Sequence, residues 1–289
     1  MTASQRHATR WEMATGDMQH TMRVHCPAQN SIMQELQITS SLDCSRQPSL
    51  FHLPDGKTEV PLVVGLHTWS FNRFNQEKHY LPLCKQYGYA LLLPEFRGPN
   101  LAENPLKEEA CGSELTRQDV IDAVKFVCDN YPIDRRNIFL LGCSGGGHMS
   151  LLAGETAPEL FRAIEIWCPV SDLILWYEYL VEAKLHYVPH LEACLGGSPA
   201  QQPDKYAERS PARHTQLLKD LPVSIHHGRY DHIVPYRHSI ALAQQLVANG
   251  NDRVFLDIFD GGHEQKPAHS FEWFAKLVGS SSAAIGITG

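Results

Sequence analysis

The chain lacks several features that mark particular protein classes. No run approaches the roughly eighteen consecutive apolar residues of a membrane-spanning helix. Residues 1–20 contain no apolar stretch of the kind found in a secretory signal. Lys and Arg form no run or stripe, and the net charge is −7. We therefore expect a cytoplasmic protein that contacts neither nucleic acid nor a membrane.

Cysteine pairs of the metal-binding or redox type are also missing. The eight cysteines include no C-x-x-C pair, which argues against a zinc ribbon or a thioredoxin-like site. Cys128, Cys143 and Cys168 lie in apolar segments and are expected to be small buried hydrophobic residues. Cys111 and Cys194 lie in loop-like contexts and could pair, a question that sequence leaves open. We expect a reduced protein without a metal or another cofactor.

What is present is a series of short apolar runs, many of them β-branched or aromatic. Such runs are typical of parallel strands buried on both faces, and they cover Val60–Leu66, Tyr89–Leu93, Ile138–Leu141, Ala163–Trp167, Val223–His226 and Val254–Phe259. Helical spacing occurs between them, at residues 120–128 and again at 240–247, where Asn249-Gly250 supplies a stop. Strands that alternate with helices predict a doubly wound, mostly parallel α/β sheet.

Two segments depart from this alternation. Leu36, Ile38 and the run 49–53 predict an antiparallel pair at the N-terminal edge of the sheet, whereas residues 1–30 are expected to be a loosely attached arm. Residues 31–289 would then form one domain. Within it, about fifty residues between Ser171 and Leu221 are too many for a plain connection. We expect a helical cap at about 172–220, and the alternative is an insertion that merely covers an edge of the sheet.

The sequence Gly142-Cys143-Ser144-Gly145-Gly146 matches G-x-S-x-G. An apolar strand runs straight into the motif, and a helical segment, 147–153, leaves it. This strand–turn–helix context is that of a nucleophile elbow, which needs small residues beside the serine and exposes the hydroxyl at a helix N-terminus. The alternatives are a glycine-rich turn or a phosphate-binding loop. We predict that Ser144 is a nucleophile.

A serine hydroxyl needs a base to take its proton, and the chain order of such folds is nucleophile, acid, histidine. Asp231 follows the run that ends at His226, and His263 follows the run that ends at Phe259. Both would lie at the carboxyl ends of strands, where ligand sites of these sheets are found. We predict Asp231 as the orienting acid and His263 as the base. A metal cluster of His227, Asp231 and His232 is the rival, but one short loop makes a poor cage.

A tetrahedral intermediate also requires backbone N–H donors. We expect one from Gly145 and the other from Trp69, with Thr68 as the alternative, in the loop that follows Leu66. The Trp69 indole would wall the acyl pocket or belong to the core. Aromatic residues of the predicted cap are the remaining candidates for substrate binding, namely Trp176, Tyr177 and Tyr179.

From about Pro61 to Leu277 the chain resembles the catalytic domain of the prolyl oligopeptidase family. The likeness is carried by LHTWS, PEFRG, GCSGGGH, HGRYDHIVP and GGHE, although Thr68 replaces a usual glycine. The resemblance implies an α/β-hydrolase fold and the three triad roles given above. It also implies that Glu95, Arg97 and Asp119 form structural ion pairs beside the site. The sixty or so residues before Val60 are too few for the β-propeller of the larger members.

The leading expectation is a serine hydrolase for small or medium carboxylic esters, including acyl esters of carbohydrates. The runner-up is a serine exopeptidase, for which Glu178 and Glu182, one helical turn apart, could bind an amino terminus. A hydrolase-fold binding protein without turnover is the third alternative.

Overall fold

The computed structural model describes residues 33–56 and 58–285. The chain divides into a unit Met1–Asn30 and a unit Ser31–Gly289, and the described residues belong to the second. The arm predicted for residues 1–30 lies outside the described residues. Among the helices in the described ranges, none is long and apolar enough to cross a membrane.

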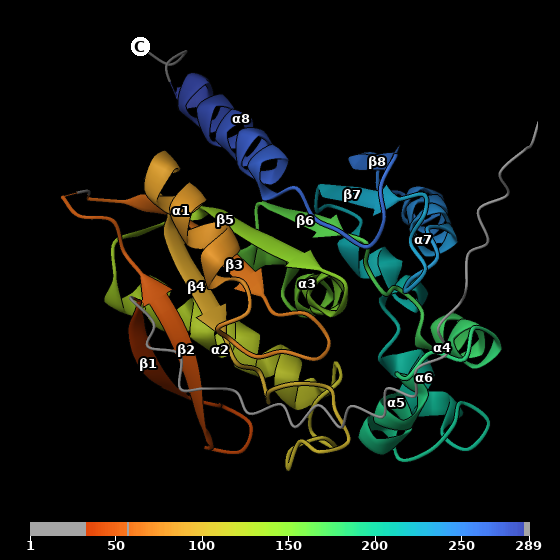
Figure 1. Cartoon of the computed structure of the whole chain (residues 1–289). Coiled ribbons are helices and arrows are strands. Elements are labelled where there is room, and N and C mark those ends of the chain that lie inside the picture. The colour runs from red at the N-terminus through yellow and green to blue at the C-terminus, as the bar shows by residue number, and fades with distance from the viewer. Residues whose placement is uncertain (1–32, 57, 286–289) are drawn as a thin grey trace, which may run out of the picture. The chain divides into compact units, whose positions relative to one another are not determined.

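A single eight-stranded sheet organises the unit, in the order β1-β2-β4-β3-β5-β6-β7-β8 (Figure 1). The pairs β1–β2 and β2–β4 are antiparallel, and the remaining pairs are parallel. The strands are β1 (Gln34–Thr39), β2 (Arg46–His52), β3 (Val60–Leu66), β4 (Ala90–Pro94), β5 (Ile133–Cys143), β6 (Ala163–Trp167), β7 (Val223–Gly228) and β8 (Val254–Phe259). The predicted mostly parallel sheet with an antiparallel N-terminal edge is confirmed.

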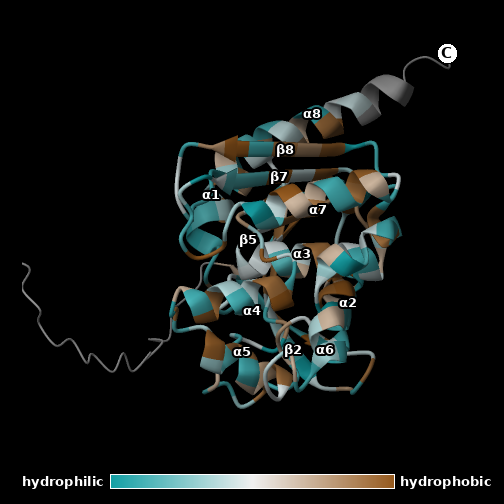
Figure 2. Ribbon diagram, turned by 90° about the vertical axis from the view of Figure 1, so that its right-hand side faces the viewer, coloured by the Kyte–Doolittle hydropathy of each residue, from teal (hydrophilic) through white to brown (hydrophobic). Residues whose placement is uncertain are grey.

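Helices cover both faces of this sheet. On one face α2 (Glu114–Asn130), α3 (Gly145–Thr156) and α7 (Arg237–Ala248) share one apolar cluster with strand side chains such as Leu62 and Ile225. On the other face α1 (Glu77–Tyr87) and α8 (Pro267–Ile285) pack on Val63 and its neighbours. Figure 2 shows α7, α3 and α2 together on the side that faces the viewer. Burial of both faces explains why the central strands are continuous apolar runs.

The segment between β6 and β7 contains α4 (Leu173–Glu182), α5 (Val188–Leu195), α6 (Pro203–Glu208) and two short 3₁₀ turns, Pro211–Arg213 and Thr215–Leu218. Asp172 caps α4, because its Oδ1 accepts hydrogen bonds from the N–H groups of Ile174 and Leu175. The insertion has its own small apolar core, made of Trp69, Cys111, Val170, Leu173, Trp176, Leu180, Leu191, Cys194, Leu195, Tyr206 and Val234. This core joins the insertion to loops at the carboxyl end of the sheet.

The expected ion pairs are present beside these loops. Arg97 Nε lies 2.6 Å from Asp119 Oδ2, and both side chains are almost fully buried. Arg73 Nη1 lies 2.8 Å from Glu95 Oε2. Buried charges persist only when they are paired in this way, so the pairs hold the loop that follows β4 in place.

Candidate active site

Ser144 lies on a strained turn between β5 and α3. Its backbone has φ 57° and ψ −120°, which is costly for a residue with a Cβ. A Cβ added at Gly142 would lie 2.2 Å from the Gly146 backbone, and one added at Gly146 would lie 2.3 Å from the Leu66 carbonyl oxygen. The flanking glycines are therefore required by close backbone approach, as expected for an elbow. The turn sets Ser144 at the N-terminal end of α3, where a developing negative charge is favoured.

Asp231 lies in the loop after β7, and its side chain is completely buried. Oδ2 accepts a hydrogen bond from His263 Nδ1 at 2.7 Å, and Oδ1 accepts from the N–H groups of Ile233 and Val234 at 2.8 and 2.9 Å. Burial acts to raise the pKa of Asp231, but hydrogen bonds from His227 and His263 outweigh it and lower this pKa below its usual value. An ionised Asp231 keeps the proton of His263 on Nδ1 and leaves Nε2 as the basic nitrogen.

Ser144 and His263 line one cavity of about 370 Å³ at the carboxyl end of the sheet. The predicted nucleophile and base therefore line the same cavity, and the predicted acid is hydrogen-bonded to the base. The residues that line this space come from separate segments of the chain and are Thr68, Trp69, Ser70, Phe71, His79, Cys143, Ser144, Tyr187, His263, Glu264 and Gln265.

The backbone around Trp69 distinguishes between the two predicted oxyanion donors. A Cβ added at Gly145 would lie 2.6 Å from Trp69 N, so these two amide groups are neighbours. The Thr68 N–H is already bonded to Asn75 Oδ1 at 3.0 Å. The Trp69 N–H, in contrast, has no acceptor among the residues that the structure describes. The geometry favours Gly145 and Trp69 over Thr68.

The Trp69 indole combines the two roles that sequence left open. Trp69 lines the cavity, yet it is only 3% exposed and packs edge-on against Trp176 at 4.7 Å between ring centroids. One end of this residue therefore forms the wall of the cavity, whereas the indole ring belongs to the core of the insertion.

The insertion presents a different aromatic residue to the cavity than sequence predicts. None of the described residues Trp176, Tyr177 and Tyr179 lines it. Instead their polar atoms hold the fold together, by hydrogen bonds to the Ile233 carbonyl, the Glu192 carboxylate and the His232 carbonyl, respectively. The expectation that these three bind substrate stays a prediction, and the residue of the insertion that lines the cavity is Tyr187, directly before α5. Sequence could not select it, because spacing does not show which side of a cap faces inward.

The exposed acids Glu178 and Glu182 also do not line the cavity. They lie on α4 together with Leu175 and Val181, which are 48% and 52% exposed. This outward face of α4 is a solvated helix surface. The acid that does line the cavity is Glu264, the residue after His263.

Two buried residues that sequence reasoning did not assign to the site surround the acid. His227 has no exposed side-chain surface, and its Nε2 donates to the Val234 carbonyl at 2.8 Å while lying 3.1 Å from Asp231 Oδ2. Ser239 Oγ donates to its Nδ1 at 2.7 Å. The only signal in the sequence is the spacing of His227 and Asp231, four residues apart in one loop.

Cys168, at the end of β6, is the second of these residues. Its thiol contacts the carbonyl oxygens of Glu264 and Gly262 at 3.5 and 3.7 Å, on either side of His263. Burial raises the pKa of this thiol to about 12, so it stays protonated and donates. Cys168 therefore holds the loop that carries the predicted base.

Cys168, His227 and Asp231 bring possible metal-ligand atoms within 4.8 Å of one another. The rival cluster from sequence contained His232, whose side chain is not in this group. The three atoms already take part in hydrogen bonds to each other and to nearby carbonyls. The arrangement is explained as the hydrogen-bonded support of Asp231 and His263.

Comparison with known proteins agrees with this architecture. Residues 74–280 match the model of the prolyl oligopeptidase family. The uncharacterized peptidase YtmA of Bacillus subtilis is 26% identical over 159 residues, which are 55% of this chain and 58% of that protein. Esterase LipC of Mycobacterium tuberculosis is 24% identical over 176 residues, which are 54% of this chain and 43% of that protein.

Among solved structures, the acylaminoacyl peptidase of Pyrococcus horikoshii superposes with a TM-score of 0.68 at 20% identity, covering 85% of this chain and 40% of that one. The likeness shows a shared fold. The chain thus spans less than two thirds of the length of each of these proteins. Because the family model covers most of it, the chain belongs to the prolyl oligopeptidase family.

Proposed function

We propose that this member of the family is a serine hydrolase that cleaves carboxylic esters through an acyl-enzyme on Ser144. The observation that carries the proposal is the shared cavity of Ser144 and His263, with Asp231 bonded to His263 from behind. These three side chains come from three separate loops, and their placement supports the roles of nucleophile, base and acid.

The proposed reaction has two stages, the formation of an acyl-enzyme and its hydrolysis. His263 Nε2 takes the proton of Ser144 as its oxygen attacks the ester carbonyl, and Asp231 stabilises the imidazolium that results. The N–H groups of Gly145 and Trp69 stabilise the oxyanion, a contribution on the order of 10²–10³ in kcat for each donor. His263 then protonates the departing alcohol, and a water molecule, activated by the same histidine, releases the acid.

The preference for esters rests on the lining of the cavity. Two aromatic residues besides Trp69, namely Phe71 and Tyr187, contribute to its walls. Aromatic walls hold acyl or aryl groups by apolar contact. Amide cleavage requires in addition that the amine leaving group be held in line with His263. The acids Glu178 and Glu182, which could have bound an amino terminus, lie away from this cavity.

The second candidate is an exopeptidase, and one observation favours it. Glu264 lines the cavity beside His263, where its carboxylate could pair with the ammonium group of a short peptide. YtmA, one of the relatives, is named a peptidase, whereas LipC is named an esterase.

The test is a comparison of matched acyl p-nitrophenyl esters and aminoacyl p-nitroanilides on wild-type protein, with Ser144→Ala as the blank. We expect a higher kcat/KM for the esters. Glu264→Gln serves as the specificity variant and should leave ester hydrolysis within about threefold, since it removes a single partly solvated charge. Efficient anilide cleavage that collapses in Glu264→Gln would make the chain a peptidase. Absence of both activities in folded protein would favour a binding protein.

A further inference from the structure

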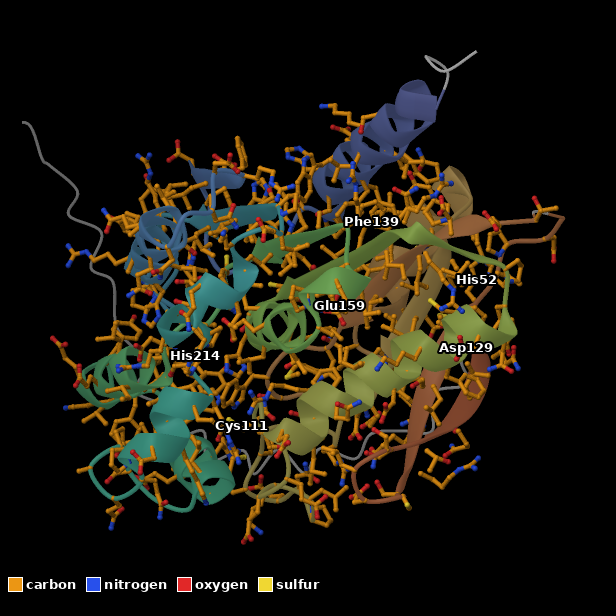
Figure 3. The ribbon with its side chains drawn as sticks, turned by 180° about the vertical axis from the view of Figure 1, so that it is seen from behind. His52, Cys111, Asp129, Phe139, Glu159 and His214 are labelled. Atoms are coloured by element: carbon orange, nitrogen blue, oxygen red, sulfur yellow. The ribbon has the colours of Figure 1, made fainter. Side chains whose placement is uncertain are left out.

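Two thiols that are distant in sequence meet at the base of the insertion. Cys111 precedes α2, and Cys194 lies near the end of α5, so they are 83 residues apart (194 − 111). Both are free cysteines, 0% and 1% exposed, and both belong to the apolar cluster at the base of the insertion, where each thiol shifts the pKa of the other. Figure 3 marks Cys111 where the insertion helices meet the start of α2. Two sulfur atoms must lie close together before a disulfide can form.

The surroundings distinguish the two sulfur atoms. Burial raises the pKa of Cys111, which therefore keeps its proton. The interaction with Cys111 lowers the pKa of Cys194, and the positive charges of Arg209 and Lys107 act in the same direction. Arg209 is itself fixed here, because its Nη1 donates to the Ala110 carbonyl at 3.0 Å. One thiol is therefore suited to react as a thiolate and the other to supply a proton.

The pair is also connected to both sides of the candidate active site. The Cys111 N–H donates to Asn100 Oδ1, and the Asn100 N–H donates to the Trp69 carbonyl, each at 2.8 Å. Cys194 lies on α5, which begins directly after Tyr187, and both Tyr187 and Trp69 line the cavity. A covalent bond between the two sulfur atoms would tie together the segments that carry these two walls.

We propose that Cys111 and Cys194 are an oxidation site, at which a small hydroperoxide converts the dithiol to a disulfide that pins α5 to the loop before α2. The Cys194 thiolate attacks the peroxide, the O–O bond breaks, and the departing hydroxide takes a proton to form water. The Cys111 sulfur then attacks the sulfenic acid on Cys194 and releases a second water. Two thiols are oxidised and one hydrogen peroxide is reduced. Because both side chains are buried, the oxidant must be small.

Peptide mapping tests the bond directly. Trypsin cleaves after Lys107 and Arg117 and after Lys184 and Lys205, so Cys111 and Cys194 fall in separate peptides, 108–117 and 185–205. After hydrogen peroxide treatment and alkylation of remaining thiols, we expect these peptides to be linked, with loss of two hydrogen atoms, and to separate on reduction with dithiothreitol. Absence of the linked species, with both peptides recovered as alkylated thiols, would overturn the proposal.

Single-cysteine variants separate this site from general oxidation. In Cys111→Ala the thiol that resolves the sulfenic acid is missing, so Cys194 should proceed to sulfinic acid at the same peroxide dose. In Cys194→Ala, Cys111 should remain a thiol, because its own pKa is raised. The exposed Cys44 provides a matched control, since Cys44→Ser should leave formation of the linked peptide unchanged. Equal oxidation of Cys111 and Cys194 in the two single variants would contradict the assigned roles.

Limited proteolysis tests what the bond does to the insertion. We expect oxidised wild-type protein to be cut within residues 173–218 at least about fivefold more slowly than reduced protein, because a cross-link suppresses local opening. Cys111→Ala should show no such protection. Equal cleavage rates before and after oxidation would show that the bond does not restrain the insertion. Neither measurement uses hydrolytic activity, so the inference stands or falls independently of the proposed function.

Discussion

The loop that carries Asp231 and the insertion that packs against it use polar groups in different ways. Around Asp231, buried donors converge on one carboxylate, so that His227, His263 and two backbone N–H groups fix its position and its charge. In the insertion, aromatic side chains each satisfy one polar atom and otherwise fill space. The first arrangement sets the position and charge of the proposed catalytic acid, whereas the second stabilises the packing of the insertion. Substitutions in the first region should therefore affect rate, and those in the second should affect stability.

The largest effect should come from Ser144→Ala. Loss of a triad nucleophile costs on the order of 10⁶ in kcat in a well-studied serine protease. Since Ala keeps the Cβ that this strained turn already accommodates, the free energy of unfolding should stay close to that of the wild type. Ester hydrolysis checks the loss of kcat, and chemical denaturation of the same preparation checks that the free energy of unfolding is unchanged. Activity of more than a few per cent would assign the chemistry to another residue.

His227→Ala should lower kcat next most strongly. This change removes the donor beside Asp231 and frees the Val234 carbonyl, so the acid and the base lose their fixed alignment. A small misplacement of catalytic groups costs on the order of 10² in rate. KM should change little, because His227 does not line the cavity. His238→Ala is the matched control: it removes another buried histidine nearby, which makes no hydrogen bond to Asp231. Equal kcat losses in the two variants would indicate a merely structural role.

Tyr179→Phe should lower the stability of the protein and leave its catalytic rate nearly unchanged. It deletes one hydroxyl that donates to the His232 carbonyl at 2.8 Å and keeps the ring. We expect a loss of about 0.5–1.5 kcal/mol in the free energy of unfolding, the usual net contribution of such a hydrogen bond. Chemical denaturation measures this loss, and kcat/KM for a small ester should stay within about threefold. A large fall in kcat at unchanged stability would erase the distinction between the two regions.

The smallest effect should be a pH dependence of stability that arises within the sheet, at His226 on β7. Burial opposes the charged form of His226, but the carboxylates of Glu165 and Asp257, which lie 3.1 and 3.3 Å from its ring nitrogens, outweigh it, and its pKa is raised above 6.5. A raised pKa means that the stabilisation is fully present below about pH 6.5 and is lost as pH rises through the folded-state pKa.

Denaturation of the wild type and of His226→Gln at pH 6 and pH 9 measures this dependence. The difference between the two proteins should be larger at pH 6. An equal difference at both values would mean that His226 contributes by packing on Trp167, whose ring stacks at 4.2 Å, rather than by charge.

The sequence predicted the parts of this molecule whose local pattern and buried environment agree. The runs at Val60–Leu66 and Ala163–Trp167 match their strands residue for residue, because these central strands are buried on both faces of the sheet. Helix α1 has no such signal: Pro82 lies within it, and few of its side chains are fully buried. Helical spacing places Val247 on a buried face, but this residue is 60% exposed, since α7 ends one residue later.

For the site, chain order selected the residues that stand at strand ends, and geometry then brought them together. The supporting role of His227 could not be predicted, since a histidine in a loop carries no periodic signal. Nor could the orientation of the cap aromatics be predicted, because two of their three partners are backbone carbonyls. A carbonyl is the same in every residue, so no sequence pattern marks it as an acceptor.

These carbonyls belong to one short segment, residues 232–234, which contacts both the insertion and Asp231. Tyr179, Trp176 and His227 donate to the carbonyl oxygens of His232, Ile233 and Val234, respectively, while two N–H groups of the same peptide bind Asp231. The acid is thus aligned by main-chain atoms whose requirements are generic. An insertion of different length and sequence could replace this one without disturbing Asp231, provided that it supplied donors for the first two carbonyls.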